Sequence, residues 1–172
     1  MIEGLAIRDA VPADAGAIAA LFAHYVERTA ITFDCHVRPP EHFAELIADR
    51  DPRHPFLIAE KDGLFAGYAY AARFRPQDAY DACVELSIYL DPQLTRGGIG
   101  TALYGELERR LHASGVTNLY ACIAYPLIAD EYLDEGSDAF HERLGFEIIG
   151  RFHACGRKFG RTYDMVWMEK LL

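Results

Sequence analysis

The segment from Val84 to Ser114 constrains the fold most, because a glycine-rich turn joins an alternating strand to a long amphipathic helix. Val84 to Leu90 alternates apolar and polar side chains, as a strand does when its two faces meet different surroundings. Gly98 to Ser114 repeats apolar residues at helical spacing, and Gly115 is placed to cap it. Arg96-Gly97-Gly98-Ile99-Gly100 lies between the two. The segment therefore predicts a strand that enters a helix through a turn with few side chains.

The chemistry of this turn suits a phosphate group. Glycines let the backbone approach a ligand, and the first amides of a helix have no acceptor within it. Together with the helix dipole these amides form an anion site, to which Arg96 can add a charge-assisted contact. A glycine turn without a ligand explains the same residues equally well. The turn is not a dinucleotide fingerprint, since it follows a middle strand and not the first one.

Glu85 is the candidate general base. In the strand that contains it the even-numbered residues are apolar, so Glu85, Ser87 and Tyr89 share the opposite face. A carboxylate one strand-length before a phosphate turn is placed to take a proton from an ammonium, directly or through a water. A solvated glutamate on an open face explains the strand alone. The adjacent turn favours the interpretation as a base.

The remaining elements follow from hydrophobic periodicity and turn residues. Helices are expected at 12–26, 41–49, 98–114 and 138–144, and strands at 6–9, 56–60, 64–74, 83–90, 119–124, 146–152 and 163–168. Their order is β, α, α, β, β, β, α, β, α, β, β. Such an order predicts a mixed α/β layered fold, and a length of 172 residues fits one domain spanning residues 1–172.

Composition limits the partners. The chain is 51% apolar and 25% charged, which is typical of a globular protein. A net charge of −9 argues against nucleic-acid and anionic-membrane partners, because both require basic surface. No apolar run is long enough to span a bilayer, and the first residues lack the features of a signal peptide, so we expect a cytoplasmic protein. The chain has four widely spaced cysteines: Cys35, Cys83, Cys122 and Cys155. They form no CxxC pair, which argues against a zinc site, and the lack of a secretory signal argues against a disulfide framework.

Several segments together carry a resemblance to a known family: Glu85 to Leu90, Arg96 to Gly100, His141 to Phe146, and Gly156 to Arg161 with Asp164. They resemble the GNAT acetyltransferases, and more narrowly the phosphinothricin and methionine-sulfoximine acetyltransferase-like branch. The resemblance covers residues 7–168. The ending at His141 to Phe146 occurs across GNAT proteins, whereas Gly156-Arg157-Lys158-Phe159-Gly160 is much more specific to this branch.

The resemblance implies an α/β fold of α+β type. Its sheet is mixed, mostly antiparallel and splayed in the middle, between the strands at Val84 and Leu119, with helices on both faces. Acetyl-CoA is the implied co-substrate and lies in the splay, with no metal. The implied cofactor contacts are Ile88, Tyr89 and Leu90 for the pantetheine arm, Arg96, Gly97, Gly98, Ile99, Gly100 and Thr101 for the pyrophosphate, and Ser137.

The implied reaction is acetyl transfer to a primary amine of a small, amino-acid-like molecule, with Glu85 as the base. His141 takes the place of a tyrosine that protonates the leaving CoA thiolate in many members, and histidine can do this work near neutral pH. A histidine that merely packs explains the position equally well. The branch builds its substrate site at positions held here by Phe33, Arg73, Arg75 and Tyr80. Arginines suit a carboxylate or phosphinate, although an exposed loop explains Arg73 and Arg75 nearly as well.

Other functions remain open at this point. An acyl-CoA sensor without transferase activity, or an enzyme that acetylates a peptide or protein amine, has the same motifs. Two departures from the branch bear on this choice. Thr95 stands where the pyrophosphate turn usually begins with Gln or Arg, and residues 125–136 are longer and more acidic than the usual connection. The acidic segment fits either a lid for a cationic substrate or a solvated loop.

Pairing of the chain with itself also remains open. Members of the branch commonly form homodimers. The sequence offers only the apolar strand from Tyr163 to Met168 as a contact, and a place in the core explains that strand equally well.

Overall fold

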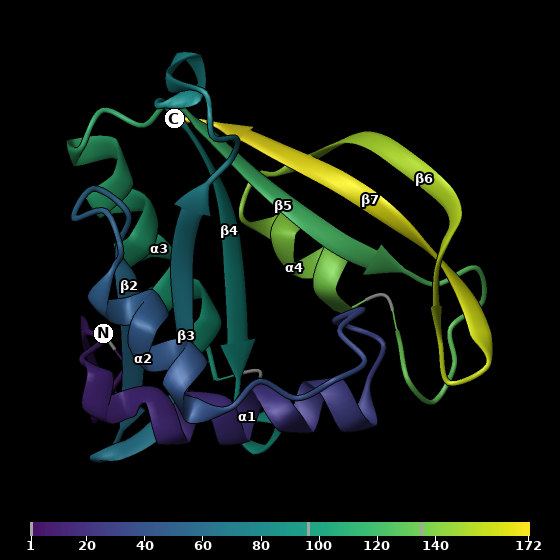
Figure 1. The fold of residues 1–172 in the computed structure, drawn as a ribbon, viewed down its shortest axis with the longest axis horizontal. Helices are drawn as coiled ribbons and strands as arrows, with labels where there is room; N and C mark the ends of the chain where they lie inside the picture. Colours follow the sequence, from purple (N-terminus) through teal and green to yellow (C-terminus); the bar gives the residue numbers. More distant parts are fainter. Residues whose placement is uncertain (1, 96, 135) are drawn as a thin grey trace.

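The computed structural model describes residues 2–95, 97–134 and 136–172. These residues form seven strands and four α-helices in the expected order (Figure 1). The elements are β1 (Leu5–Asp9), α1 (Ala15–Arg28), α2 (Pro40–Ala48), β2 (Phe56–Lys61), β3 (Leu64–Arg73), β4 (Cys83–Leu90), α3 (Ile99–Ala113), β5 (Asn118–Tyr125), α4 (Gly136–Arg143), β6 (Glu147–Lys158) and β7 (Arg161–Leu171). None of the helices in these described parts has the length and apolarity to cross a membrane.

The strands form one sheet in the order β1-β2-β3-β4-β5-β7-β6. All neighbours are antiparallel except β4 and β5, which are parallel. These two strands pair only from Cys83 to Glu85 with Asn118 to Tyr120, and beyond that point they diverge. Figure 1 shows the gap that opens between them. The expected mixed, mostly antiparallel sheet with a splay in its middle is therefore confirmed.

Helices cover both faces of the first half of the sheet. On one face α3 buries Leu103, Leu107 and Leu111 in a core shared with Val84 and Leu86. On the other face α1 and α2 pack Ile18, Phe22 and Phe43 against Phe56 and Tyr68. The alternation along β4 decides which side chain enters which core, and it leaves Glu85 on the α1 face.

The β6–β7 hairpin extends beyond the strands expected at 146–152 and 163–168. The buried carboxylate of Asp164 on β7 holds an irregular stretch of β6 in place, because it accepts hydrogen bonds from Ala154 N (2.6 Å) and Arg151 Nε (2.5 Å). The hairpin then turns at Phe159 and Gly160, both of which have positive φ. The expected strand ends were wrong here because residues 153–160 lack the alternation of a regular strand.

Candidate active site

The turn before α3 has the geometry of an anion site. Gly98 precedes the helix with φ +78°, a conformation that favours glycine. The first described helical bond is from Ala102 N to Gly98 O (3.0 Å), so the amides of Ile99, Gly100 and Thr101 lie at the open end of α3. Arg96, which the sequence assigns to the same site, lies outside the described residues.

A cavity of about 650 Å³ lies between this turn, the end of β4 and the start of α4. Many of the residues expected to bind the cofactor line it: Ile88, Leu90, Gly98, Gly100, Thr101 and Ser137. Thr95 and His141 line it as well. Three expected contacts do not line it: the side chain of Ile99 is buried in the core, Tyr89 packs edge-on against Phe22 and Tyr25, and Gly97 lies in the turn outside the wall.

The main chain of β4 alternates between its two neighbours. Cys83 O accepts from Phe74 N, and Asp91 N donates to Ala66 O, so odd-numbered positions direct their backbone groups to β3. The backbone groups of Ile88 and Leu90 therefore point into the gap left by β5, whereas those of Tyr89 point to β3. The hydroxyl of Tyr25 on α1 donates to Leu90 O (2.6 Å) at the end of this edge.

Glu85 lies in the last row where β4 and β5 pair, opposite Ala72 of β3 and Tyr120 of β5. Burial raises the pKa of its carboxyl above the usual 4.5, and the positive charge of Arg75 opposes this rise. The surrounding face is not open, because Tyr89 further along β4 is covered by aromatic rings of α1. A partly desolvated carboxylate at the mouth of the splay is suited to accept a proton.

The two arginines expected in the substrate site lie on different faces. Arg75 covers the ring of Phe74, with 4.2 Å from Cζ to the ring centre, and Phe74 stacks on Tyr120 beside Glu85. Arg73 pairs with Val84 and therefore points to the other face, where Asp78 (3.0 Å) and Asp81 (2.5 Å) bind its guanidinium. Tyr80 is exposed and touches Phe74 edge-on. The structure brings Arg75 toward Glu85 but not Arg73.

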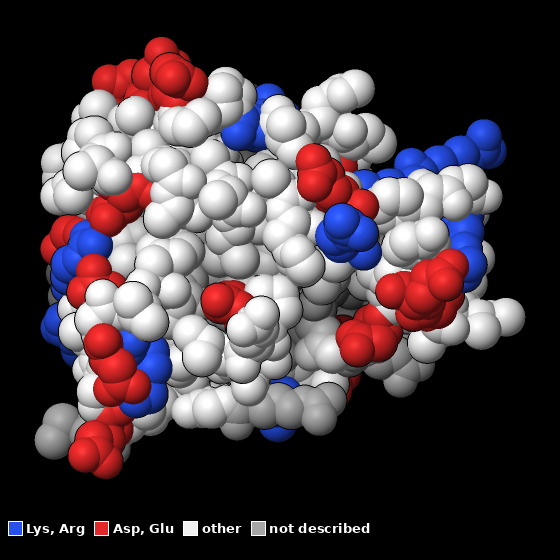
Figure 2. Space-filling view, turned by 90° about the horizontal axis from the view of Figure 1, so that it is seen from below, with Lys and Arg blue, Asp and Glu red and all other residues white. Residues whose placement is uncertain are grey.

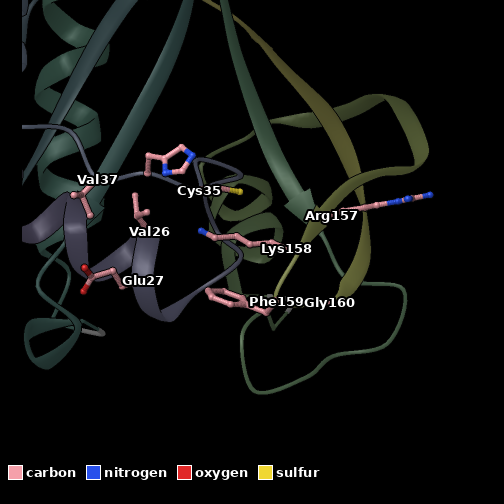
Figure 3. Close-up of a pocket in the computed structure, with 9 residues that line it drawn as sticks. Val26, Glu27, Cys35, Val37, Arg157, Lys158, Phe159 and Gly160 are labelled. Carbon is pink, nitrogen blue, oxygen red and sulfur yellow. The ribbon is translucent and has the colours of Figure 1, made fainter.

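Phe33 lies at the far end of the splay, where the segment after α1 crosses to the hairpin. Its ring packs on Gly156 of β6 and on Tyr163 of β7. The neighbouring Thr32 O accepts a hydrogen bond from Lys158 Nζ (2.8 Å). Figure 3 shows Lys158 directed toward α1 while Arg157 points away. A second cavity of about 710 Å³ adjoins this contact, and none of the sequence-predicted site residues lines it.

His141 on α4 is buried, and both of its ring nitrogens have partners. Nδ1 lies 2.7 Å from Ser137 O, a pure acceptor, so this nitrogen carries the proton. Nε2, at 3.1 Å from the Tyr104 hydroxyl, then accepts from it. Burial lowers the pKa of the ring, while the hydrogen bond to Ser137 opposes that change. His141 is thus a neutral side chain in the cavity wall, tied to α3.

Eight residues of the cavity wall have no place in the sequence-based site: Tyr25, Ile31, Thr95, Asp134, Gly136, Ala139, Phe140 and Arg143. A basic residue in the last turn of α4, the helix that also carries His141, is a signal that could have indicated Arg143. Ile31 and Asp134 come from irregular segments, for which the sequence carries no such pattern.

Comparisons with known proteins agree with this geometry. A family model described as an acetyltransferase (GNAT) domain matches residues 7–167. The phosphinothricin N-acetyltransferase of Streptomyces viridochromogenes is 30% identical over 164 residues, which cover 95% of this chain and 86% of the relative. The L-methionine sulfoximine/L-methionine sulfone acetyltransferase of Pseudomonas paraeruginosa is 32% identical, covering 95% of this chain and 92% of the relative.

A solved structure gives the same picture. The phosphinothricin acetyltransferase of Sinorhizobium meliloti in complex with AcCoA superposes with a TM-score of 0.87 and 33% identity, covering 98% of this chain and 89% of that one. The chain belongs to the GNAT family and is an acetyl-CoA-dependent N-acetyltransferase that resembles the phosphinothricin and methionine-sulfoximine branch. Among the described residues, no group of three or more metal-ligating side chains lies together.

Proposed function

We propose that this enzyme acetylates the primary amine of a small, amino-acid-like molecule, with Glu85 as the general base. The observation that carries the proposal is the place of Glu85, a half-buried carboxylate with a raised pKa where β4 and β5 diverge. Arg75, on the same side, supplies a cation that suits the carboxylate of an amino acid. The names of the relatives, which act on phosphinothricin and methionine sulfoximine, support this class of acceptor.

Acetyl-CoA is proposed to lie in the cavity between β4 and α4. Its pantetheine arm would run along the backbone groups that Ile88 and Leu90 direct into the splay, and its pyrophosphate would bind the amides of Gly98 to Thr101. Residue 100 packs tightly against the cavity wall, since a Cβ there would lie 3.0 Å from a Leu90 methyl and 3.2 Å from Phe140. Glycine at this position lets the start of α3 pack against Leu90 and Phe140 without a steric clash.

A thiol-release screen tests the proposal. The purified chain is incubated with acetyl-CoA and one acceptor at a time from amino acids, methionine sulfoximine, phosphinothricin, polyamines and short peptides. We expect CoA release with amino-acid-like acceptors and little with polyamines or peptides. Tight CoA binding by calorimetry without thiol release from any acceptor would instead indicate the acyl-CoA sensor, and release with peptides alone would indicate a peptide amine as acceptor.

We also propose that residues 1–172 act as one domain and pair as a homodimer. The apolar residues Tyr163, Val166 and Met168 of β7 are buried in the chain's own cores, so they offer little apolar surface to a partner. The edge strand β6 supports pairing better, because it exposes Ile148, Ile149 and Phe152. Size-exclusion chromatography with light scattering gives the molecular mass in solution, and a monomer at micromolar concentration would refute the homodimer.

The proposed surroundings are the cytoplasm, without nucleic acid or membrane as partner. Four free cysteines suit a reducing compartment. On the face seen in Figure 2, acidic side chains stand alone or beside basic ones around a broad area that is mostly uncharged. That face offers no continuous basic surface to a polyanion, in keeping with the net charge of −9.

A further inference from the structure

The connection from β5 to α4 is a folded strap and not a solvated loop. We define the strap as residues 126–134; it runs beside the tip of the β6–β7 hairpin (Figure 1). Asp130 organises it, because one carboxylate oxygen accepts from Tyr132 N (2.8 Å) and Leu133 N (2.9 Å). The other oxygen accepts from the Tyr163 hydroxyl (2.9 Å) and lies 3.0 Å from the Arg161 guanidinium.

The acidic groups of the strap are engaged within the protein. Besides Asp130, Glu131 pairs with Arg161 at 2.6 Å, and Asp134 accepts from Gly136 N (2.9 Å) at the start of α4. Glu135 lies outside the described residues. Arg161 pairs with two of these carboxylates and Asp134 meets a backbone amide, so the contacts fix where the acidic groups lie without cancelling all of their charge.

The strap is held at two contacts, and each involves a residue whose next neighbour in the chain lines the cofactor cavity. Tyr132 O accepts from Ala30 N (2.9 Å), and the next residue after Ala30 is Ile31, which lines the cavity. Leu133 is buried against Ala30 and Tyr163, and the next residue is Asp134, which also lines the cavity. The hairpin, the strap and the segment after α1 thus contact one another beside the cofactor cavity.

We propose that the strap is a positioning element for the acetyl donor, and that it acts by fixing Ile31 and Asp134 in the wall of the cavity. The inference rests on the proposed placement of acetyl-CoA there. Because the strap touches neither Glu85 nor Arg75 in any described contact, its loss affects the affinity for the donor and not the chemical step.

The test uses two variants of the full chain, Asp130→Ala and Tyr163→Phe. The first variant removes the carboxylate that accepts all of these hydrogen bonds. The second keeps the aromatic ring but removes one hydrogen bond to Asp130. We expect the KM for acetyl-CoA and the Kd for CoA to rise about fivefold or more in the first variant and less in the second. The kcat at saturating acetyl-CoA remains within about twofold. Asp51→Ala is the matched control, because that carboxylate also accepts from a backbone amide and pairs with an arginine, Arg53, but lies between α2 and β2, outside the strap; its KM remains at the wild-type value.

The possible outcomes distinguish a failure of the strap's role from a failure of the proposed donor site. Lowered thermal stability with unchanged KM and Kd in both variants would show that the strap only braces the hairpin, and would overturn the inference. If Asp130→Ala does not fold, Tyr163→Phe decides alone. A wild-type chain that fails to bind CoA would remove the proposed placement of the donor, and the role of the strap with it.

Discussion

The ring of Phe33 lies directly on the backbone of Gly156, so closely that a methyl group at residue 156 would overlap it. The contact joins the segment after α1 to the β6–β7 hairpin across the open end of the splay. Lys158, two residues further along β6, reinforces it by donating to Thr32 O. The Gly-x-Lys part of the branch-specific motif thus has a structural reason, since one residue receives the ring and the other binds the adjacent carbonyl.

Gly156→Ala is expected to displace Phe33 and loosen this connection. Forcing an extra methyl into a packed contact typically costs about 1–3 kcal/mol, which corresponds to several degrees in Tm. If Phe33 is part of the acceptor site, the KM for the acceptor rises as well. Gly150→Ala on the same strand is the control, because no atom lies within 4 Å of the new methyl. Equal thermal melts for the two variants would contradict the role of Gly156.

Gly98→Ala tests the anion site at the start of α3. Residue 98 has φ +78°, where an alanine is strained by about 1 kcal/mol, so the turn is expected to distort and the Kd for CoA to rise. Gly105→Ala on the exposed side of the same helix is the matched control. No atom lies within 4 Å of its new methyl, and alanine stabilises a helix by about 1 kcal/mol relative to glycine. If calorimetry finds the same CoA affinity in both variants, the turn is not the site that binds the pyrophosphate.

The sequence predicted the parts of the fold that depend on local pattern. The alternation of Val84 to Leu90 and the stripe of α3 each depend on one element, and both elements were placed correctly. The tip of the β6–β7 hairpin was not, because its irregular strand is held by Asp164 from the opposite strand. An interaction between distant residues leaves no periodic signal in either segment.

In the candidate site, too, local pattern predicted some residues, whereas contacts between separate segments place the others. Gly98 and Gly100 of the turn line the cavity, and their place follows from the strand–turn–helix order; Ser137 lines it too, at a position that only the family resemblance indicated. Arg73 and Arg75 could not be separated from the sequence, since the end of β3 determines which of them faces Glu85. Ile31 and Asp134 enter the cavity wall only because the strap folds against the hairpin, which depends on contacts among three separate segments.

Glu85→Gln is expected to reduce kcat by about 100-fold or more if Glu85 is the base, while the Kd for CoA remains close to the wild-type value. The acid limb of the wild-type kcat/KM profile should follow the pKa of Glu85, which burial raises above 4.5. Activity therefore falls as the pH drops through that raised value, because the protonated carboxyl accepts no proton. A variant with wild-type turnover at neutral pH would remove Glu85 from the mechanism.

Arg75→Gln tests the electrostatic partner of the base. The positive charge of Arg75 lowers the pKa of Glu85, so removing it should move the acid limb of the profile to higher pH. Arg73→Gln is the control, because Arg73 binds Asp78 and Asp81 on the other face. An acid limb that shifts equally in both variants would indicate a general charge effect instead of a specific one.

The lowered pKa of His141 has a consequence for stability. Burial keeps the ring neutral in the folded chain, whereas in the unfolded chain it titrates near its usual 6.5. Below that pH the unfolded state binds more protons, so the free energy of unfolding decreases as the pH falls from about 6.5 toward the lowered value. Urea titrations of wild type and His141→Gln between pH 5 and 8 give the free energy of unfolding of each as a function of pH, and the variant should lack this decrease. Parallel curves would mean that His141 titrates normally in the folded state.

Tyr104→Phe separates the two roles left open for His141. The Tyr104 hydroxyl donates to Nε2 and so favours the neutral ring, and its removal should raise the pKa of His141 in an NMR titration. If His141 protonates the leaving thiolate, a higher pKa provides more of the protonated ring near neutral pH, and kcat rises or is maintained. If His141 only joins α4 to α3, the same variant loses a buried hydrogen bond, and its stability falls by about 1 kcal/mol while the pH profile of kcat keeps its shape.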